Sequence, residues 1–444
     1  MNRIVILGAG TAGTIMANRL SKRYRAELRA GDMSIAVVDQ DDRHVYQPGL
    51  LFIPFRTYDP SDTIKPRQRQ LGEHVTYVQA AIDRVEPDED RVYLAEGRTL
   101  DYDVLIVATG TRIAPEETEG LTAEGWQDTM FEFYTLDGAI ALRDALDDWD
   151  GGRMVVNIVD VPIKCPIAPL EFVFLADEYF TRKQMRDRVT ITLVTPLDGA
   201  FTRPIAAKSL GDLLAEKNIE LVPEFATGEV DGPNRKLISW DDRTIDFDLL
   251  VTIPAHMGAE YIGRSPGLGD DMQFVLTDPG TLQAKRKPNI FALGDATNLP
   301  TSKAGSVAHF EAEVLEDNVR RFFTGEPLEA AFDGHANCFI ETGFDKAVLI
   351  DFNYDVEPLP GRFPSTLGPM PLLKESRLNH WGKLAFKWVY WHLLLPGRDL
   401  PGIPARMSMR GKRRGDLPRL QRHHVQGGAP EAAASDEPEA THVA

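Results

Sequence analysis

Residues 3–13 read RIVILGAGTAG, an apolar run that leads directly into three glycines. The glycines have the spacing G-x-G-x-x-G and are Gly8, Gly10 and Gly13. The first glycine of this pattern permits a tight turn, the second lets the backbone approach a pyrophosphate, and the third lets the next helix pack closely against the strand. The N-terminus of that helix stabilises the anion. The stretch therefore predicts a strand, a turn and a helix that bind a dinucleotide.

The chain after this turn continues the same pattern. A helix-like run covers residues 14–24, and a second apolar strand covers residues 34–38 and ends at Asp39. Asp39 follows Gly13 by 26 positions and is expected to accept a hydrogen bond from a ribose hydroxyl. Two later apolar strands also end in small or acidic residues, which are Thr109, Gly110, Gly294 and Asp295. These repeated strand ends predict an α/β fold.

At 444 residues the chain is too long for one ordinary core. We expect two Rossmann-like three-layer domains, the first of them discontinuous, and a C-terminal membrane-associating segment. The expected boundaries are residues 1–150 for the first part of the dinucleotide-binding domain, 151–285 for the second Rossmann-like domain, 286–335 for the return segment, 336–424 for a C-terminal redox and membrane-binding region, and 425–444 for a disordered tail.

The composition narrows the class of protein. A hydrophobic fraction of 43% and a charged fraction of 26% are typical of soluble globular proteins. No apolar stretch reaches 18 residues and no signal peptide precedes the first strand, so we expect neither a membrane-spanning helix nor secretion. We expect no metal site. The net charge is −18, yet residues 374–422 hold twelve Lys/Arg against three Asp/Glu. This pattern argues against nucleic acid as a partner and favours anionic lipid.

The chain contains two cysteines, Cys165 and Cys338. Beside a dinucleotide site such a pair suggests two-electron sulfur chemistry, although buried thiols often serve only as small apolar groups. The second α/β unit has no glycine between Gly152 and Gly199, so close approach of its backbone to a second pyrophosphate is not expected. The electron donor is therefore not expected to be a nicotinamide.

These motifs together resemble the sulfide:quinone oxidoreductases, flavoproteins of the disulfide-reductase superfamily, over about residues 1–410. The segments around residues 108–110 and 293–296 are similar to the second and third FAD motifs of that superfamily. The most specific similarity is residues 165–172, CPIAPLEF, in which Glu171 follows the cysteine by six positions. The chain departs from the family pattern in one respect. Many members have a third cysteine shortly after the second motif, whereas residues 111–134 of this chain contain none.

The resemblance implies FAD as cofactor, with Asp295 at the ribityl chain and Lys303 near the flavin ring. It implies that Cys165 and Cys338 lie on either side of the flavin, bridged by sulfur, and pass electrons from sulfide to FAD and then to a membrane quinone. Glu171 is a candidate proton acceptor if burial raises its pKa, and the site is expected to lower a cysteine pKa. The alternatives are an NADH:quinone oxidoreductase of the same superfamily, a non-catalytic membrane-binding flavoprotein, and a flavoprotein subunit with a haem partner.

A helix expected from His380 to Leu395 has six apolar residues on one face and Lys383 and Lys387 on another. The apolar face comprises Trp381, Leu384, Ala385, Trp388, Trp391 and Leu395. Tryptophans with flanking lysines are typical of the headgroup boundary, so we expect a peripheral membrane protein on the cytoplasmic side. A cut before Asn379 is then expected to release the protein from membranes while reduction of the flavin by sulfide survives. A homo-oligomer is left open.

Overall fold

The computed structural model describes residues 1–413, and the expected disordered tail lies outside this range. Within the described residues, no helix is both long and apolar enough to cross a membrane.

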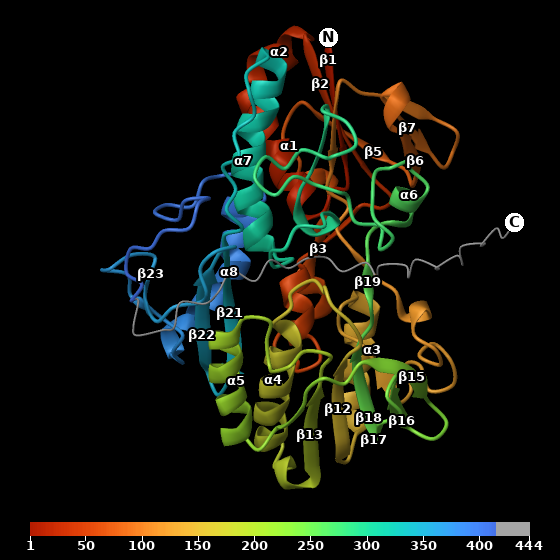
Figure 1. Ribbon diagram of the computed structural model, residues 1–444, viewed down its shortest axis with the longest axis vertical. Coiled ribbons are helices and arrows are strands. Elements are labelled where there is room, and N and C mark those ends of the chain that lie inside the picture. Colours follow the sequence, from red (N-terminus) through yellow and green to blue (C-terminus); the bar gives the residue numbers. More distant parts are fainter. Residues whose placement is uncertain (414–444) are drawn as a thin grey trace, which may run out of the picture. The chain divides into compact units, whose positions relative to one another are not determined.

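The first domain is built on a parallel sheet with strand order β20-β9-β1-β2-β5. Its strands are β1 (Asn2–Leu7), β2 (Met33–Asp39), β5 (Val75–Gln79), β9 (Val104–Val107) and β20 (Ile290–Ala292). Because side chains alternate along a strand, Ile4 and Ile6 face a core with α1 (Thr11–Arg23) and α7 (Gly305–Thr324), while Val5 and Leu7 face the opposite core. A three-stranded sheet, β6 (Ile82–Glu86), β7 (Arg91–Leu94) and β8 (Thr99–Asp101), covers that second face. These layers occupy the upper half of Figure 1.

The second domain repeats this plan in the lower half of Figure 1. Its parallel sheet has the order β11-β18-β12-β13-β14. The strands are β11 (Met130–Phe131), β12 (Gly152–Ile158), β13 (Val189–Val194), β14 (Glu220–Val222) and β18 (Leu249–Ile253). The surrounding helices are α3 (Leu136–Asp148), α4 (Ala168–Arg182) and α5 (Pro204–Glu216), and a small antiparallel sheet comprises β15 (Thr227–Asp231), β16 (Lys236–Ser239) and β17 (Thr244–Asp246). The α/β fold with two Rossmann-like domains is thus confirmed, and β20 makes the first domain discontinuous.

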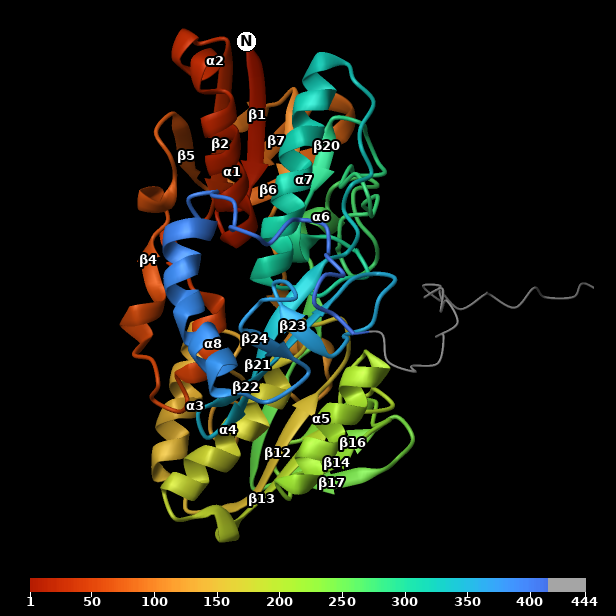
Figure 2. The same ribbon diagram turned by 90° about the vertical axis from the view of Figure 1, so that its left-hand side faces the viewer.

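A third sheet follows α7 and has the order β21-β22-β24-β23. Its strands are β21 (Ala336–Gly343), β22 (Lys346–Phe352), β23 (Gly361–Phe363) and β24 (Met370–Leu372). Strand β21 is an edge strand that packs against α4 of the second domain. Helix α8 (Arg377–Val389) packs on β21 and β22 and lies toward the viewer in Figure 2.

The expected continuous C-terminal helix is wrong at its end. Helix α8 stops at Val389 and a π-helical turn covers Tyr390–Leu394. A π turn holds more residues than an α turn, so it rotates the following side chains away from the expected face. Trp381 and Trp388 are 69% and 58% exposed, whereas Trp391 and Leu395 are 7% and 1% exposed and belong to the core.

The lysines of this region also depart from the expectation of a solvated basic surface. The ammonium of Lys383 lies 2.8 Å from the carboxylate of Glu171 and is nearly buried. Lys412, in the basic run near the end of the described residues, forms a buried ion pair with Asp351. Lys383 and Lys412 are therefore not free to attract anionic lipid, although the sequence count includes both.

Candidate redox site between the two domains

The turn after β1 has the geometry that a dinucleotide pyrophosphate requires. A Cβ on Gly13 would lie 1.8 Å from the carbonyl oxygen of Gly8, so only glycine lets α1 approach the strand. Gly8 has φ +96°, which a side chain would strain, whereas nothing lies within 4 Å of a Cβ placed on Gly10. Gly10 caps α1 without a side-chain hydrogen bond, which leaves the first-turn amides for an anionic ligand. These residues fit the expected cofactor.

The remaining residues expected at the cofactor line the same edge of the first sheet. Asp39 ends β2, and its carboxylate accepts hydrogen bonds from the amide of Ala9 at 2.7 Å and from Arg67 at 2.6 Å. Burial raises the pKa of Asp39. Thr109 follows β9, with its hydroxyl 3.2 Å from that of Tyr261. The sequence did not predict Arg67, whose guanidinium lies beside the oxygen expected to face a ribose.

The turn after β20 brings Gly294 and Asp295 to the same edge. Gly294 has φ +71° and donates its amide hydrogen to Glu311 of α7. Burial raises the pKa of Asp295 and raises that of Glu311 to about 8. The ammonium of Lys303, which is expected near the flavin ring, donates to the carbonyl oxygens of Asp295 at 2.8 Å and Thr297 at 2.6 Å. Lys303 therefore braces the turn from within.

Cys165 occupies the loop between β12 and α4, the place where a second glycine fingerprint would stand. Its φ is +47°, a left-handed conformation that is uncommon outside glycine. Its amide donates to the carbonyl of Lys303 at 2.7 Å, and its own carbonyl accepts from the amide of Ala168 and the hydroxyl of Tyr134. Two distant segments, at Lys303 and Tyr134, and the start of α4 thus hold this cysteine, and the loop binds to the first domain through Lys303.

Cys338 lies on β21, and both cysteines are half-buried free thiols. The charge of Cys165, when ionised, raises the pKa of Cys338, so the two side chains share one environment. The pKa of Cys165 is raised to about 12, chiefly by burial and to a smaller degree by the Glu171 carboxylate. The expected lowering of a cysteine pKa is therefore wrong for this structure, because loss of water outweighs the opposing pull of the Lys383 ammonium.

Glu171 and Lys383 satisfy the open edge of β21 beside the cysteines. One carboxylate oxygen of Glu171 accepts from the amide of Glu341 at 2.8 Å, and the ammonium of Lys383 donates to the carbonyl of Phe339 at 3.1 Å. The other oxygen of Glu171 is buried without a hydrogen-bond partner. Burial raises the pKa of Glu171, as its expected role in proton transfer requires. The surface-carboxylate alternative is excluded, since Glu171 is fully buried.

Sequence reasoning missed several ionisable residues around the cysteines. Lys164 precedes Cys165, and burial lowers the pKa of its ammonium near Asp295 and Glu132. Lys383, Glu341 and His380 continue the buried network from Glu171 toward the surface. Adjacency to Cys165 was a signal for Lys164, whereas no local pattern marks the other three residues.

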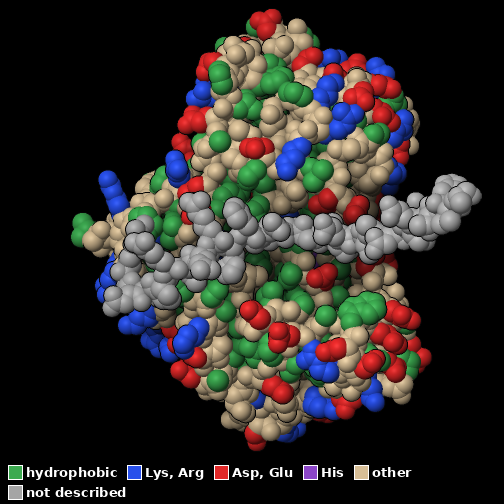
Figure 3. All heavy atoms as spheres, viewed as in Figure 1, with side chains coloured by type: hydrophobic (Ala, Val, Ile, Leu, Met, Phe, Trp, Pro, Cys, Tyr) green, Lys and Arg blue, Asp and Glu red, His purple; other side chains and the backbone are tan. Residues whose placement is uncertain are grey.

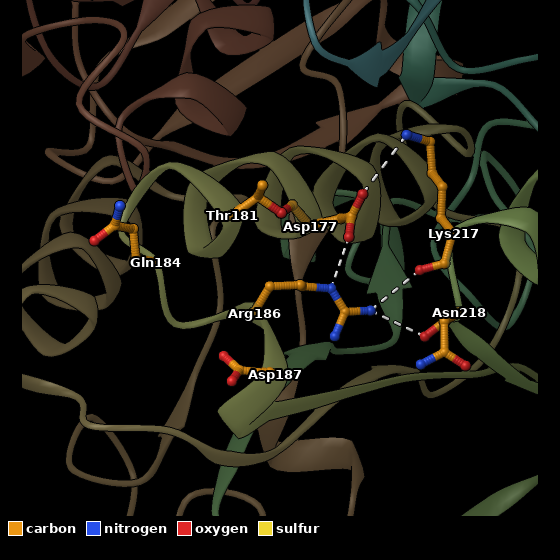
Figure 4. Close-up of a pocket in the computed structure, with 7 residues that line it drawn as sticks. All are labelled: Asp177, Thr181, Gln184, Arg186, Asp187, Lys217 and Asn218. Atoms are coloured by element: carbon orange, nitrogen blue, oxygen red, sulfur yellow. Dashed lines mark hydrogen bonds and ion pairs between the residues drawn. The ribbon is translucent and has the colours of Figure 1, made fainter.

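A separate hollow of about 550 Å³ lies at the far end of α4, away from these residues (Figure 4). Arg186 donates there to the carboxylate of Asp177 and to the carbonyls of Val189, Lys217 and Asn218. Lys217 lies 3.6 Å from the second oxygen of Asp177. This paired arrangement ties α4 to the neighbouring loops and supplies no redox chemistry.

The comparison with known proteins agrees with this geometry. Residues 2–157 match the sequence model of the pyridine nucleotide-disulphide oxidoreductases. The chain is 26% identical over 403 residues to the mitochondrial sulfide:quinone oxidoreductase of Dictyostelium discoideum, covering 90% of this chain and 87% of that protein. The corresponding protein of Mus musculus is 24% identical, over 89% of this chain and 86% of the relative. The chain is thus similar over about nine tenths of its length to sulfide:quinone oxidoreductases.

A solved structure shares the fold of this chain over nearly its whole length. The sulfide:quinone oxidoreductase of Aquifex aeolicus superposes with a TM-score of 0.74 at 17% identity, covering 90% of this chain and 92% of that chain. The protein is an oxidoreductase of the flavoprotein superfamily, and its cofactor is a flavin. In this chain the β12–α4 loop carries Cys165 and no glycine.

Loss of Lys383 should destabilise the protein strongly. We expect Lys383→Met to cost about 3–5 kcal/mol in the free energy of unfolding, because the buried Glu171 carboxylate would lose its counter-charge. Lys387→Met is the matched control on the same helix. Lys387 is partly exposed, and its ion pair with Asp62 is weak because the two groups are 4.0 Å apart. Urea unfolding of the holoenzyme measures both. A double variant with Glu171→Gln should regain most of the loss, and equal effects of the two lysine substitutions would contradict the buried pair.

Proposed function

We propose that the protein is an FAD-dependent enzyme that oxidises sulfide to zero-valent sulfur and reduces a membrane quinone. The observation that carries this proposal is the placement of the chain's two cysteines beside one buried ion pair. Cys165 precedes the first turn of α4, which carries Glu171, and Cys338 precedes Phe339, whose carbonyl accepts a hydrogen bond from Lys383, the partner of Glu171. FAD is favoured over a mononucleotide flavin because the glycine turn and Asp39 provide for a pyrophosphate and a ribose. A bound flavin supplies a two-electron acceptor and donor at this site.

The cysteines carry the sulfur in the proposed cycle. In the oxidised state Cys165 and Cys338 are joined by a sulfur bridge. Attack by HS⁻ breaks one sulfur–sulfur bond and leaves a persulfide on one cysteine and a thiolate on the other. Re-formation of the bridge releases one sulfur atom, one proton and two electrons. The thiolate is the reacting form, and the ammonium of Lys383 stabilises it, since it opposes the rise in the pKa of both cysteines.

Glu171 is proposed to accept the proton that sulfide releases. Its unpartnered oxygen is buried, and burial raises its pKa toward the range in which it can take and return a proton. The same carboxylate raises the pKa of Cys165. Glu171 is thus placed to take up the proton that re-formation of the bridge releases.

Anaerobic addition of sulfide to the purified holoenzyme tests the proposed function. We expect the flavin absorbance to bleach and to return when a soluble quinone is added. Bleaching by NADH in place of sulfide would instead identify an NADH:quinone oxidoreductase. A flavin that neither reagent bleaches would identify a non-catalytic flavoprotein.

We further propose that the protein binds the membrane surface through α8. The helix has Leu378, Trp381 and Trp388 exposed, whereas Lys383 and Asn379 point inward. A helix docked on its own domain would have the opposite polarity, with tryptophans inside and lysine outside. The face drawn in Figure 3 intersperses acidic, basic and apolar side chains over both domains. Membrane contact at α8 would let quinone enter from lipid.

Substitution of the exposed tryptophans should release the protein from membranes without harming its fold. We expect Trp381→Ser with Trp388→Ser to weaken binding to anionic lipid vesicles more than tenfold, since each side chain would lose its burial in lipid, about 1.5–3 kcal/mol. Co-sedimentation with vesicles measures this binding. Trp240→Ser is the matched control, because Trp240 is 79% exposed on the small sheet of the second domain. Equal loss in the control variant would contradict a dedicated membrane face.

A further inference from the structure

The proposed reaction requires a proton from water at a buried site. Oxidation of HS⁻ to sulfur releases one proton and two electrons, whereas reduction of a quinone to a quinol consumes two electrons and two protons. Each turnover therefore takes up one proton in addition to the one that sulfide supplies. Glu171 is fully buried, Lys383 is 11% exposed, and both cysteines are half-buried. If the proposed function holds, this proton must reach the buried site from solvent.

Two residues extend the network from Glu171 toward the surface. Glu341 follows Cys338 on β21, and its side chain is 1% exposed. Its amide donates to Glu171, and its carboxylate lies 2.9 Å from Nδ1 of His380 on α8. The imidazole of His380 is 17% exposed, and its Nε2 lies 4.0 Å from Asp345, which is 60% exposed in the β21–β22 turn. Acidic and basic groups thus lead from solvent to the cysteines.

The surroundings of Glu341 suit a group that both gains and loses a proton. The pKa of Glu341 is raised to about 7, chiefly by burial and to a smaller degree by the Glu171 carboxylate. His380 and Lys383 of α8 act in the opposite direction. Tyr58, from the segment after η1 (Gln47–Phe52), also faces this carboxylate, and burial raises the pKa of its phenol. A carboxyl group with a pKa near the working pH is an efficient proton carrier.

We propose that His380 and Glu341 form a proton relay from solvent to the Glu171–Lys383 pair. His380 takes a proton from water at Nε2, beside Asp345, and releases one from Nδ1 to the Glu341 carboxylate. Glu341 and Glu171 make no direct side-chain hydrogen bond, so reorientation of the Glu341 carboxyl group carries the proton to the unpartnered oxygen of Glu171. From there the proton passes to the reduced quinone. Both residues act on the reaction through Glu171 and are positioning residues for proton delivery.

The test follows reoxidation of the photoreduced holoenzyme by a short-chain ubiquinone in detergent. We expect Glu341→Gln and His380→Ala to slow reoxidation about 10- to 100-fold. Reoxidation by ferricyanide, which takes up no proton, should change less than twofold, and added imidazole should restore His380→Ala. His74→Asn is the matched control, since this partly exposed histidine has only Glu73 nearby. Because photoreduction needs no sulfide, the result is independent of whether sulfide is the natural donor.

A second measurement does not depend on turnover. The infrared band of a protonated carboxyl group should titrate near pH 7 in the oxidised wild-type holoenzyme, since Glu341 holds its proton below a pKa of about 7 and loses it above. This band should be missing from Glu341→Gln. Equal slowing with quinone and ferricyanide, or no effect of imidazole and an unchanged infrared titration, would overturn the relay. Failure of sulfide to bleach the wild-type flavin would overturn only the proposed function.

Discussion

Replacement of Cys338 by serine should abolish reduction of the flavin by sulfide while the flavin stays bound. The proposed cycle needs two sulfur atoms, and the chain has only two cysteines. Cys338 lies on β21, whereas the glycine turns that fit the cofactor belong to the first domain. The substitution therefore removes a reactive sulfur atom and leaves these turns unchanged. Cys165→Ser should have nearly the same effect. Stopped-flow absorbance after anaerobic addition of sulfide measures the loss.

Dithionite provides the control for these variants. It reduces a bound flavin without the cysteines, so both variants should bleach with dithionite as the wild type does. The serine hydroxyl is slightly smaller than the thiol and costs about 1–3 kcal/mol when it lacks a buried partner, which a stable two-domain protein tolerates. A cysteine variant that still bleaches with sulfide at the wild-type rate would rule out the sulfur relay.

The fold could be predicted because its signals are local. The strand, turn and helix at Gly8–Gly13 need only neighbouring residues to form, and the same holds for the strand ends at Gly110 and Gly294. The missing glycines after β12 were also informative, since the absence of a fingerprint is visible within one short segment. In the structure that segment holds Cys165 against Lys303 instead.

The electrostatics of the site could not be predicted because its pairs are distant in the chain. Lys383 and Glu171 are 212 positions apart, and His380 and Glu341 are 39 apart. A helical wheel separated the tryptophans of α8 from Lys383 correctly, but it cannot tell which side faces the protein. The wheel also assumes uniform α-helical geometry, so it placed Trp391 and Leu395 on the wrong side of the π turn.

Removal of residues 379–444 should abolish flavin binding and leave little soluble protein, contrary to the effect expected from the sequence. The cut deletes Tyr390, whose hydroxyl lies 2.7 Å from both the hydroxyl of Thr11 and the imidazole of His44 at the dinucleotide turn. It also deletes Trp391, Leu394 and Leu395, which are at most 7% exposed. Burial of these four side chains contributes about 6–12 kcal/mol, comparable with the whole stability of a typical domain, about 5–15 kcal/mol.

The same cut leaves two buried carboxylates without their cations. Glu171 would lose Lys383, and Asp351 would lose Lys412. Each unpaired charge adds to the cost of folding. The matched control is a chain that ends at Arg413, which keeps every contact described above and should retain its flavin. Soluble yield and flavin content per protein measure both forms. A chain lacking residues 379–444 that still binds flavin and bleaches with sulfide would show that α8 and the π turn serve the membrane alone. We expect the opposite result, because Tyr390 of the π turn contacts Thr11 and His44 beside the dinucleotide turn.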